Sequence, residues 1–169
     1  MLTEFHPINA NLRGILAISP RPRGGDWLDD EMNVWREAGI HHVVSLLTTA
    51  EASDLGLEEE QETCRRHSLE FTNFAIEDRS VPAANSGAAE LVDSISEDLA
   101  RGRNVLIHCR QGLGRAATIA AAVLIENGWT SDAAISRISQ DRTVEVPETV
   151  EQRRWIENFI PARAPESSR

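Results

Sequence analysis

The chain contains four segments rich in apolar residues, and each of them predicts a β-strand. They occupy residues 12–19, 41–48, 69–76 and 104–109. A fifth run at residues 2–9 is a weaker candidate because it contains Pro7, which cannot donate a hydrogen bond to a neighbouring strand. The strand pattern therefore predicts four or five strands between residues 2 and 109.

The segments between these runs have the spacing of helices. Asp26 is placed to cap a helix in which Leu28, Met32 and Trp35 share one face, and Gly39 marks its end. The segment 57–67 begins acidic and ends basic, which suits the helix dipole. Four further helices are predicted, at 88–100, 115–127, 131–140 and 149–160.

Strands that alternate with helices indicate βαβ units. They predict a single α/β domain with a central, mostly parallel sheet of four to five strands and helices on both faces. We expect this domain to span residues 1–160 and the segment PARAPESSR, residues 161–169, to be a disordered tail. A chain of 169 residues is long enough for one such domain with a sizeable core.

Charge and hydropathy exclude two classes of partner. The 17 basic and 27 acidic residues give a net charge of −10, which argues against a general binder of nucleic acid or anionic membranes. The longest apolar run, residues 116–125, is 10 residues long, about half of a membrane span, and predicts a buried helix.

Cysteine usage and the N-terminal segment point to the cytoplasm. Cys64 and Cys109 are too few for a disulfide framework and fit a reducing compartment. The first residues, MLTEFHPINANLRG, lack a basic stretch followed by an apolar one, so no secretory signal is expected.

The strongest chemical signal is HCRQGLGR, residues 108–115, which joins the last predicted strand to the following helix. Cys109 stands at the carboxyl end of a strand, where open α/β sheets bind their ligands. Gly112 and Gly114 allow the loop to wind with its backbone N–H groups pointing inward. Arg115 opens the helix and adds a planar guanidinium that can hold two phosphate oxygens.

Together these groups suit a tetrahedral dianion. The helix N-terminus adds unpaired N–H groups and a positive dipole end, and the same field favours a thiolate over a thiol. A sulfur anion beneath a bound phosphate is placed for in-line attack on phosphorus. We therefore predict Cys109 as the nucleophile and the rest of the loop as the phosphate cradle; the alternative is an inert buried cysteine beside a solvated arginine. The predicted cradle consists of Arg110, Gln111, Gly112, Leu113, Gly114 and Arg115.

HCRQGLGR resembles the His-Cys-x5-Arg signature of the cysteine-dependent protein tyrosine and dual-specificity phosphatases. The resemblance implies a phosphocysteine intermediate, no metal or other cofactor, and an aspartate on a separate loop as general acid. The fold of that family, a parallel-sheet α/β domain, agrees with the predicted elements. In the order of its elements over residues 12–160 the chain is most similar to the compact, kinase-associated-phosphatase-like branch.

The departing oxygen needs a proton from the far side of the phosphate. FAIEDRSVP, residues 74–82, is similar to the short acid loop of the family, in which an aspartate precedes a proline by four positions. The resemblance therefore implies Asp78 as the general acid. Two alternatives stay open: that the acid is the neighbouring Glu77, and that Asp78 merely caps a surface turn beside Arg79.

Three further positions take their meaning from the resemblance. His108 precedes the nucleophile, as in the family, where the imidazole helps to fix the loop and thiolate; a packed core histidine is the alternative. Ala116 stands where the family usually has a serine or threonine, although the phosphatases of regenerating liver also have GLGRA, and we expect slow breakdown of the intermediate. Gln152 could position the attacking water, as in some relatives, or could complete a capping box with Thr149.

The remaining candidates have simple structural alternatives. Cys64 could form a protective disulfide with Cys109 or be a buried helix residue. Arg21 and Arg23 could form a basic rim or belong to a surface turn. The other histidines are not spaced as metal ligands, so no metal site is expected: His41, His42 and His67.

Three functions remain to be separated. The first is a phosphatase acting on phosphotyrosine, and also phosphoserine or phosphothreonine, of proteins. The second has the same chemistry on a non-protein phosphate such as an inositol phosphate or lipid; a loop with one arginine and Leu113, rather than two lysines, favours the first. The third is a slow module that binds a phosphate or docks a partner.

Overall fold

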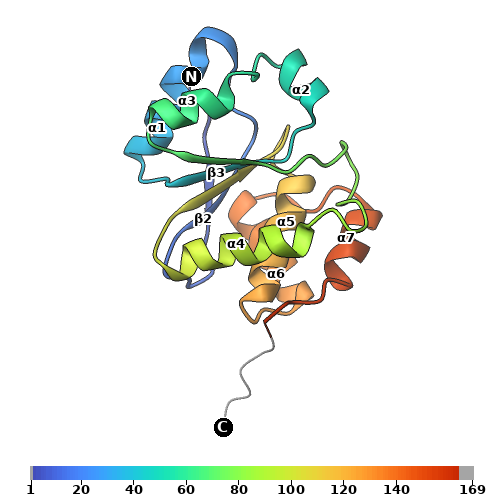
Figure 1. Ribbon diagram of the computed structural model, residues 1–169. Coiled ribbons are helices and arrows are strands. Elements are labelled where there is room, and N and C mark those ends of the chain that lie inside the picture. The colour runs from blue at the N-terminus through green and yellow to red at the C-terminus, as the bar shows by residue number, and fades with distance from the viewer. Residues whose placement is uncertain (1, 164–169) are drawn as a thin grey trace.

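Residues 2–163 are described by the computed structural model of the chain (Figure 1). Five strands and seven α-helices alternate along it, with one 3-10 turn. The strands are β1 His6–Ile8, β2 Leu16–Ser19, β3 His42–Ser45, β4 Glu70–Asn73 and β5 Val105–His108. The helical elements are η1 Gly25–Trp27, α1 Leu28–Glu37, α2 Thr49–Asp54, α3 Glu60–Arg66, α4 Ala88–Ala100, α5 Arg115–Glu126, α6 Ser131–Arg142 and α7 Val150–Glu157.

The strands form one sheet in the order β1-β2-β5-β3-β4. β2, β5, β3 and β4 run parallel, and β1 pairs antiparallel with β2 at one edge. The predicted α/β domain with a mostly parallel sheet is therefore confirmed. Pro7 is tolerated because β1 is an edge strand, which has no neighbour on its outer side.

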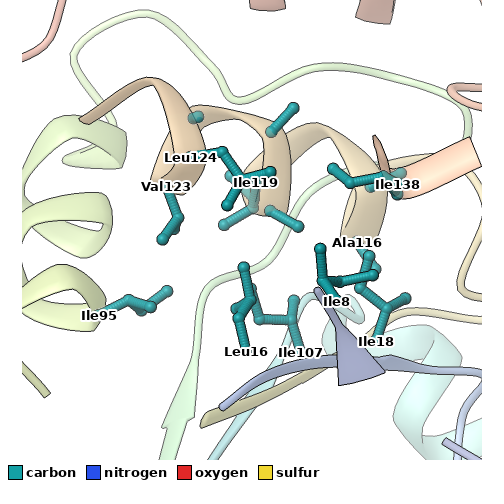
Figure 2. Packing of buried hydrophobic residues seen from close by; sticks show 14 of the residues in the cluster. Ile8, Leu16, Ile18, Ile95, Ile107, Ala116, Ile119, Val123, Leu124 and Ile138 are labelled. Atoms are coloured by element: carbon teal, nitrogen blue, oxygen red, sulfur yellow. The ribbon is translucent and has the colours of Figure 1, made fainter. Parts of the chain in front are cut away.

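Helices cover both faces of the sheet (Figure 1). On one face α4, α5, α6 and α7 pack over a large apolar cluster that includes Leu16, Ile18, Ile107 and Ile119 (Figure 2). On the other face α1 and α3 enclose a second cluster around Trp35, with Leu106 from β5. Successive residues of a strand point to opposite faces, so β5 contributes to both clusters.

Two details differ from the sequence prediction. Asp26 does not cap α1: it lies in η1, where the chain is already helical, so α1 follows Trp27 with no side-chain cap. Helix α2 was not expected from apolar spacing, because none of its residues is buried. Its signal is instead the capping box of Thr48 and Glu51, in which each side chain accepts the other residue's backbone N–H.

The chain after α7 returns to the far end of α5. The backbone N–H groups of Ala162 and Arg163 donate to the Glu126 carboxylate at 2.9 and 2.8 Å. The rest of the predicted tail, residues 164–169, lies outside the described residues, and the domain boundary at residue 160 stays a prediction. Within residues 2–163 no helix has the length and apolar character needed to cross a membrane.

Candidate active site

The loop from Cys109 to Arg115 lies at the carboxyl end of β5, between β2 and β3. Strand alternation separates its first two residues. Cys109 joins the apolar cluster beneath α5, whereas the ring of His108 lies 6.1 Å from the ring of Trp35, which belongs to the cluster on the other face. The thiol and the imidazole therefore occupy opposite faces of the sheet.

The backbone of this loop turns its N–H groups inward. Gly112 has a φ of +70°, and a Cβ there would lie 2.8 Å from the backbone of Ser19, so only glycine fits. Its N–H donates to the Cys109 sulfur at 3.2 Å. In the described part of the chain the N–H groups of residues 110, 111, 113 and 114 meet no acceptor. These N–H groups are therefore free to bind an anion, and the phosphate cradle stays a prediction.

Arg115 is a buried cation held by the Glu51 carboxylate and the Ile76 carbonyl. Its side chain is 2% exposed. It donates to both oxygens of Glu51 at 2.7 and 2.9 Å, and to the Ile76 carbonyl at 2.8 Å. Burial acts to lower the pKa of Arg115, but the bonds to Glu51 and the charge of Cys109 outweigh it and raise the pKa. Arg115 is therefore fixed in place and fully charged.

Asp78 faces this arginine from the loop after β4. One carboxylate oxygen lies 3.2 Å from the Arg115 guanidinium, and the side chain is 54% exposed. Glu77, the alternative acid, is exposed and does not line the cavity above the cysteine. The geometry thus brings Asp78, rather than its neighbour, to the thiol and the guanidinium.

One cavity of about 210 Å³ unites these groups. Its lining contains six of the predicted site residues, plus two others. The predicted ones are Asp78, Cys109, Arg110, Gln111, Gly114 and Arg115, of which Asp78 comes from the separate loop, and the unexpected ones are Arg79 and Glu148. Gly112 and Leu113 do not line it: Gly112 acts through its backbone, and Leu113 packs against the core beneath α5.

His108 lies behind the loop rather than in the cavity. Its Nε2 is 2.7 Å from the Glu60 carboxylate on α3, and its Nδ1 is 3.3 Å from the Cys109 carbonyl. Both side chains of the His108–Glu60 pair are almost completely buried. The two ring nitrogens thus contact a backbone carbonyl on one side and a carboxylate on the other. His108 thus links α3 to the cysteine loop, and its supporting role stays a prediction.

Gln152 completes the capping box of α7. Its side-chain Oε1 accepts from the Thr149 N–H at 3.2 Å, and its side-chain Nε2 donates to the Ser80 carbonyl at 3.1 Å in the Asp78 loop. The residue is fully buried and does not line the cavity. Gln152 therefore connects α7 with the acid loop, and its role toward water stays a prediction.

Cys64 and Cys109 lie on opposite faces of the sheet and are too far apart in the fold to form a disulfide. The Cys64 sulfur lies 3.3 Å from that of Met32 in the cluster on the α1 and α3 face, across the sheet from Cys109. Both cysteines are free. Burial, with a smaller contribution from Glu60, raises the pKa of Cys64 well above its usual range. Cys64 is a buried helix residue, which was the structural alternative.

A second polar cluster lies at the other end of the sheet. The Nδ1 and Nε2 atoms of His42 are 2.7 Å from Asp98 and 2.8 Å from the Thr72 hydroxyl. Arg103 bonds both Asp98 and Glu70. Although His42, Glu70 and Asp98 lie close enough together to surround an ion, hydrogen bonds already satisfy these groups.

The Glu51–Arg115 pair makes stability depend on pH. Burial acts to raise the pKa of Glu51, but the hydrogen bonds from Arg115 and Thr48 lower it below the ordinary value of 4.5. A carboxyl group with a lower pKa in the folded state stabilises it at higher pH, and that contribution disappears as pH falls through the folded pKa. We expect Glu51→Gln to lower the free energy of unfolding by about 1–3 kcal/mol at pH 7.

Urea unfolding between pH 7 and pH 3 measures this effect. The difference between the parent and Glu51→Gln should shrink as the pH falls below about 4.5. Glu62→Gln serves as the control, because Glu62 pairs with Arg65 on the exposed side of α3 and should matter little. A difference that stays constant with pH would show that the Glu51 charge does not hold Arg115.

Comparison with known proteins agrees with this arrangement. The family described as "Polymorphic toxin system, DSP-PTPase phosphatase" matches residues 19–129, which include both the Asp78 loop and the cysteine loop. No curated protein matches the chain.

Solved structures share the whole fold. Kinase associated phosphatase is 18% identical, with 94% of each chain covered and a TM-score of 0.85. PTPMT1 in complex with PI(5)P is 18% identical, with 92% of this chain and 93% of that chain covered and a TM-score of 0.74. Tk-PTP in the active form is 25% identical, with 86% and 92% covered and a TM-score of 0.70. The sheet and its helices are thus those of cysteine-dependent phosphatases.

Proposed function

The chain belongs to the DSP-PTPase phosphatase family, and from this premise we propose that it hydrolyses phosphomonoesters of proteins through a phosphocysteine intermediate. One observation carries the proposal. The Cys109 sulfur, the buried Arg115 guanidinium and the Asp78 carboxyl group converge on one cavity.

In the first step the Cys109 thiolate attacks phosphorus. The S–P bond forms as the P–O bond to the leaving group breaks, and Asp78 in its acid form donates a proton to the departing oxygen. The inward N–H groups and Arg115 hold the three remaining phosphate oxygens, whose charge they stabilise throughout.

In the second step water attacks the phosphocysteine. The Asp78 carboxylate takes a proton from this water, the S–P bond breaks, and inorganic phosphate and the thiolate are released. Ala116 is fully buried in the apolar cluster that also contains Cys109, and it offers no hydroxyl to the departing sulfur. The second step is therefore the slow one in this proposal.

A non-protein phosphate is the second candidate substrate. Arg79 and Arg110 line the cavity beside Arg115, so a second phosphate group would find further cations. PTPMT1, which has the same fold, was crystallised with the phosphoinositide PI(5)P. The Glu148 carboxylate on the same cavity would repel such a group, which favours the singly phosphorylated protein side chain.

A substrate panel tests the proposal. Phosphotyrosine, phosphoserine and phosphothreonine peptides would be assayed beside inositol phosphates and a phosphoinositide, with phosphate release as the readout. The highest kcat/KM should be found for a phosphopeptide. A preference for the inositol compounds would move the assignment to the second candidate, and tight binding of every compound without release would indicate a docking module.

We further propose that the protein works in the cytoplasm. The chemistry needs Cys109 as a free thiolate, and both cysteines are free. A reducing compartment preserves such a thiol.

Ala116→Ser should speed up turnover. A hydroxyl at this position would donate to the departing sulfur, and one such donor contributes up to about 10²-fold. Rapid-quench measurements should show a phosphoenzyme that accumulates in the parent and disappears in the variant. Ala117→Ser, one residue further along α5, is the control and should leave kcat unchanged. Equal turnover in parent and variant, with no phosphoenzyme in the parent, would refute slow breakdown.

A further inference from the structure

Arg142, the last residue of α6, lies directly behind the cysteine loop. Its side chain is buried, and the residue is 8% exposed. Its Nε donates to the Gly112 carbonyl at 3.1 Å, and its Nη2 donates to the Gln111 carbonyl at 3.3 Å. A single guanidinium thus holds two consecutive carbonyl groups of the loop from outside.

These contacts determine where the loop N–H groups point. In a trans peptide the C=O and the following N–H point in opposite directions. The Gln111 carbonyl shares a peptide plane with the Gly112 N–H, which donates to the Cys109 sulfur at 3.2 Å. Because Arg142 holds the Gln111 carbonyl on the outer side of the loop, the Gly112 N–H points at the sulfur. The bond from Arg142 to the Gly112 carbonyl points the Leu113 N–H inward in the same way.

The two preceding peptide planes are held in the same way. The Cys109 carbonyl lies against His108 Nδ1, and the Arg110 carbonyl accepts from the Arg21 N–H at 3.1 Å. Arg142 therefore completes an outer ring of donors around the loop. Without it, the two planes nearest the middle of the loop could turn their carbonyl oxygens toward the anion.

Arg142 is also a buried cation without a close counter-ion. Among the described residues no carboxylate lies within ion-pair distance of it, and the charges that it faces are those of Cys109 and Glu4. Burial lowers its pKa, which the charge of Cys109 counteracts. A buried charge needs compensation, and here the thiolate and the carboxyl end of α6 supply it.

We propose that Arg142 is a positioning residue that orients the loop N–H groups toward Cys109 and adds a second cation behind the phosphate. The inference rests on the proposed function, because it assigns Arg142 a role in the same thiolate and phosphate site. Arg142 touches neither the cavity nor the substrate, so it acts entirely through the loop backbone and through its charge.

Other charged groups also affect the Cys109 thiol, the bound anion or Arg142, so the test must leave them unchanged. Arg115 on α5 faces the thiol, His108 on β5 contacts the Cys109 carbonyl, and Asp78, Arg79, Arg110 and Glu148 line the cavity above the thiol. On the β1 side, Glu4 and His6 face Arg142. None of these groups changes in the variants below.

The test uses Arg142→Met, Arg142→Gln and Arg142→Lys in the full chain carrying Cys64→Ala, so that Cys109 is the single reactive cysteine. The first measurement is the rate of alkylation by iodoacetamide as a function of pH. The second is the affinity for tungstate, a tetrahedral dianion, by titration calorimetry. Arg137→Met on the same helix is the control, because Arg137 pairs with Asp141 outside the site.

Arg142→Met should move the midpoint of the alkylation profile upward by about one pH unit and weaken tungstate binding about tenfold to a hundredfold. Arg142→Lys keeps the positive charge and a donor group. It should therefore restore part of the shift in the alkylation midpoint and part of the lost tungstate affinity. If Arg142→Met does not fold, Arg142→Gln decides, since it removes the same charge but keeps an N–H donor.

An unchanged midpoint with tungstate affinity within twofold of the parent would overturn the inference, even if thermal stability fell. Neither measurement requires turnover. A parent Cys109 that alkylates like an ordinary exposed thiol and does not bind tungstate would instead overturn the proposed function, and the inference with it.

Discussion

Cys109→Ser should lower kcat/KM for a phosphotyrosine peptide by at least about 10⁴-fold, because a serine hydroxyl is not ionised and cannot replace the sulfur anion. The loop N–H groups and Arg115 remain, so the variant should still bind the peptide. Steady-state kinetics gives the loss, and calorimetry with the uncleaved peptide gives the affinity.

Cys64→Ala is the matched control for this experiment. Cys64 is the other cysteine, but it lies across the sheet from the cavity, and the variant should keep the activity of the parent. Substantial hydrolysis by Cys109→Ser would exclude covalent catalysis by this thiol. Loss of both activity and peptide affinity would show that the substitution disturbs the loop itself.

Asp78→Asn should lower kcat/KM by about 10²- to 10⁴-fold for phosphotyrosine and phosphothreonine peptides, because the departing oxygen then leaves without a proton. The loss should be much smaller for an aryl phosphate with an acidic phenol, whose anion leaves unaided. Comparing the two substrates separates proton donation from binding.

Glu77→Gln is the control for Asp78→Asn. Glu77 is the adjacent carboxylate and is exposed outside the cavity, so its loss should have little effect. Equal losses in the two variants, or an Asp78→Asn defect that is the same for both leaving groups, would argue against Asp78 as the proton donor. The contact of Asp78 with Arg115 would then be its main role.

The cysteine loop could be predicted from the sequence because it is local. Cys109, Gly112 and Arg115 lie within seven consecutive residues, and the strand before them and the helix after them follow from short-range apolar spacing. The mostly parallel sheet could also be predicted from local patterns, because alternating strands and helices allow few topologies.

The residues that hold the loop are not local. Glu51 reaches Arg115 over 64 positions, Glu60 reaches His108 over 48, and Arg142 reaches Gly112 over 30. Apolar periodicity carries no information about such pairs. The sequence did contain one usable sign: Thr48-x-x-Glu51 has the form of a capping box, which places a helix start beside the carboxylate that meets Arg115.

Because successive side chains of β5 point to opposite faces of the sheet, His108 and Cys109 have different surroundings. Trp35 and Glu60 contact His108, which precedes the nucleophile, and neither of them lines the cavity that a substrate would occupy. Changes at Arg79, Arg110 or Glu148 alter that space and leave the buried pair untouched. The reactivity of the thiol can therefore be altered from the Trp35 face without any change to the space that a substrate occupies.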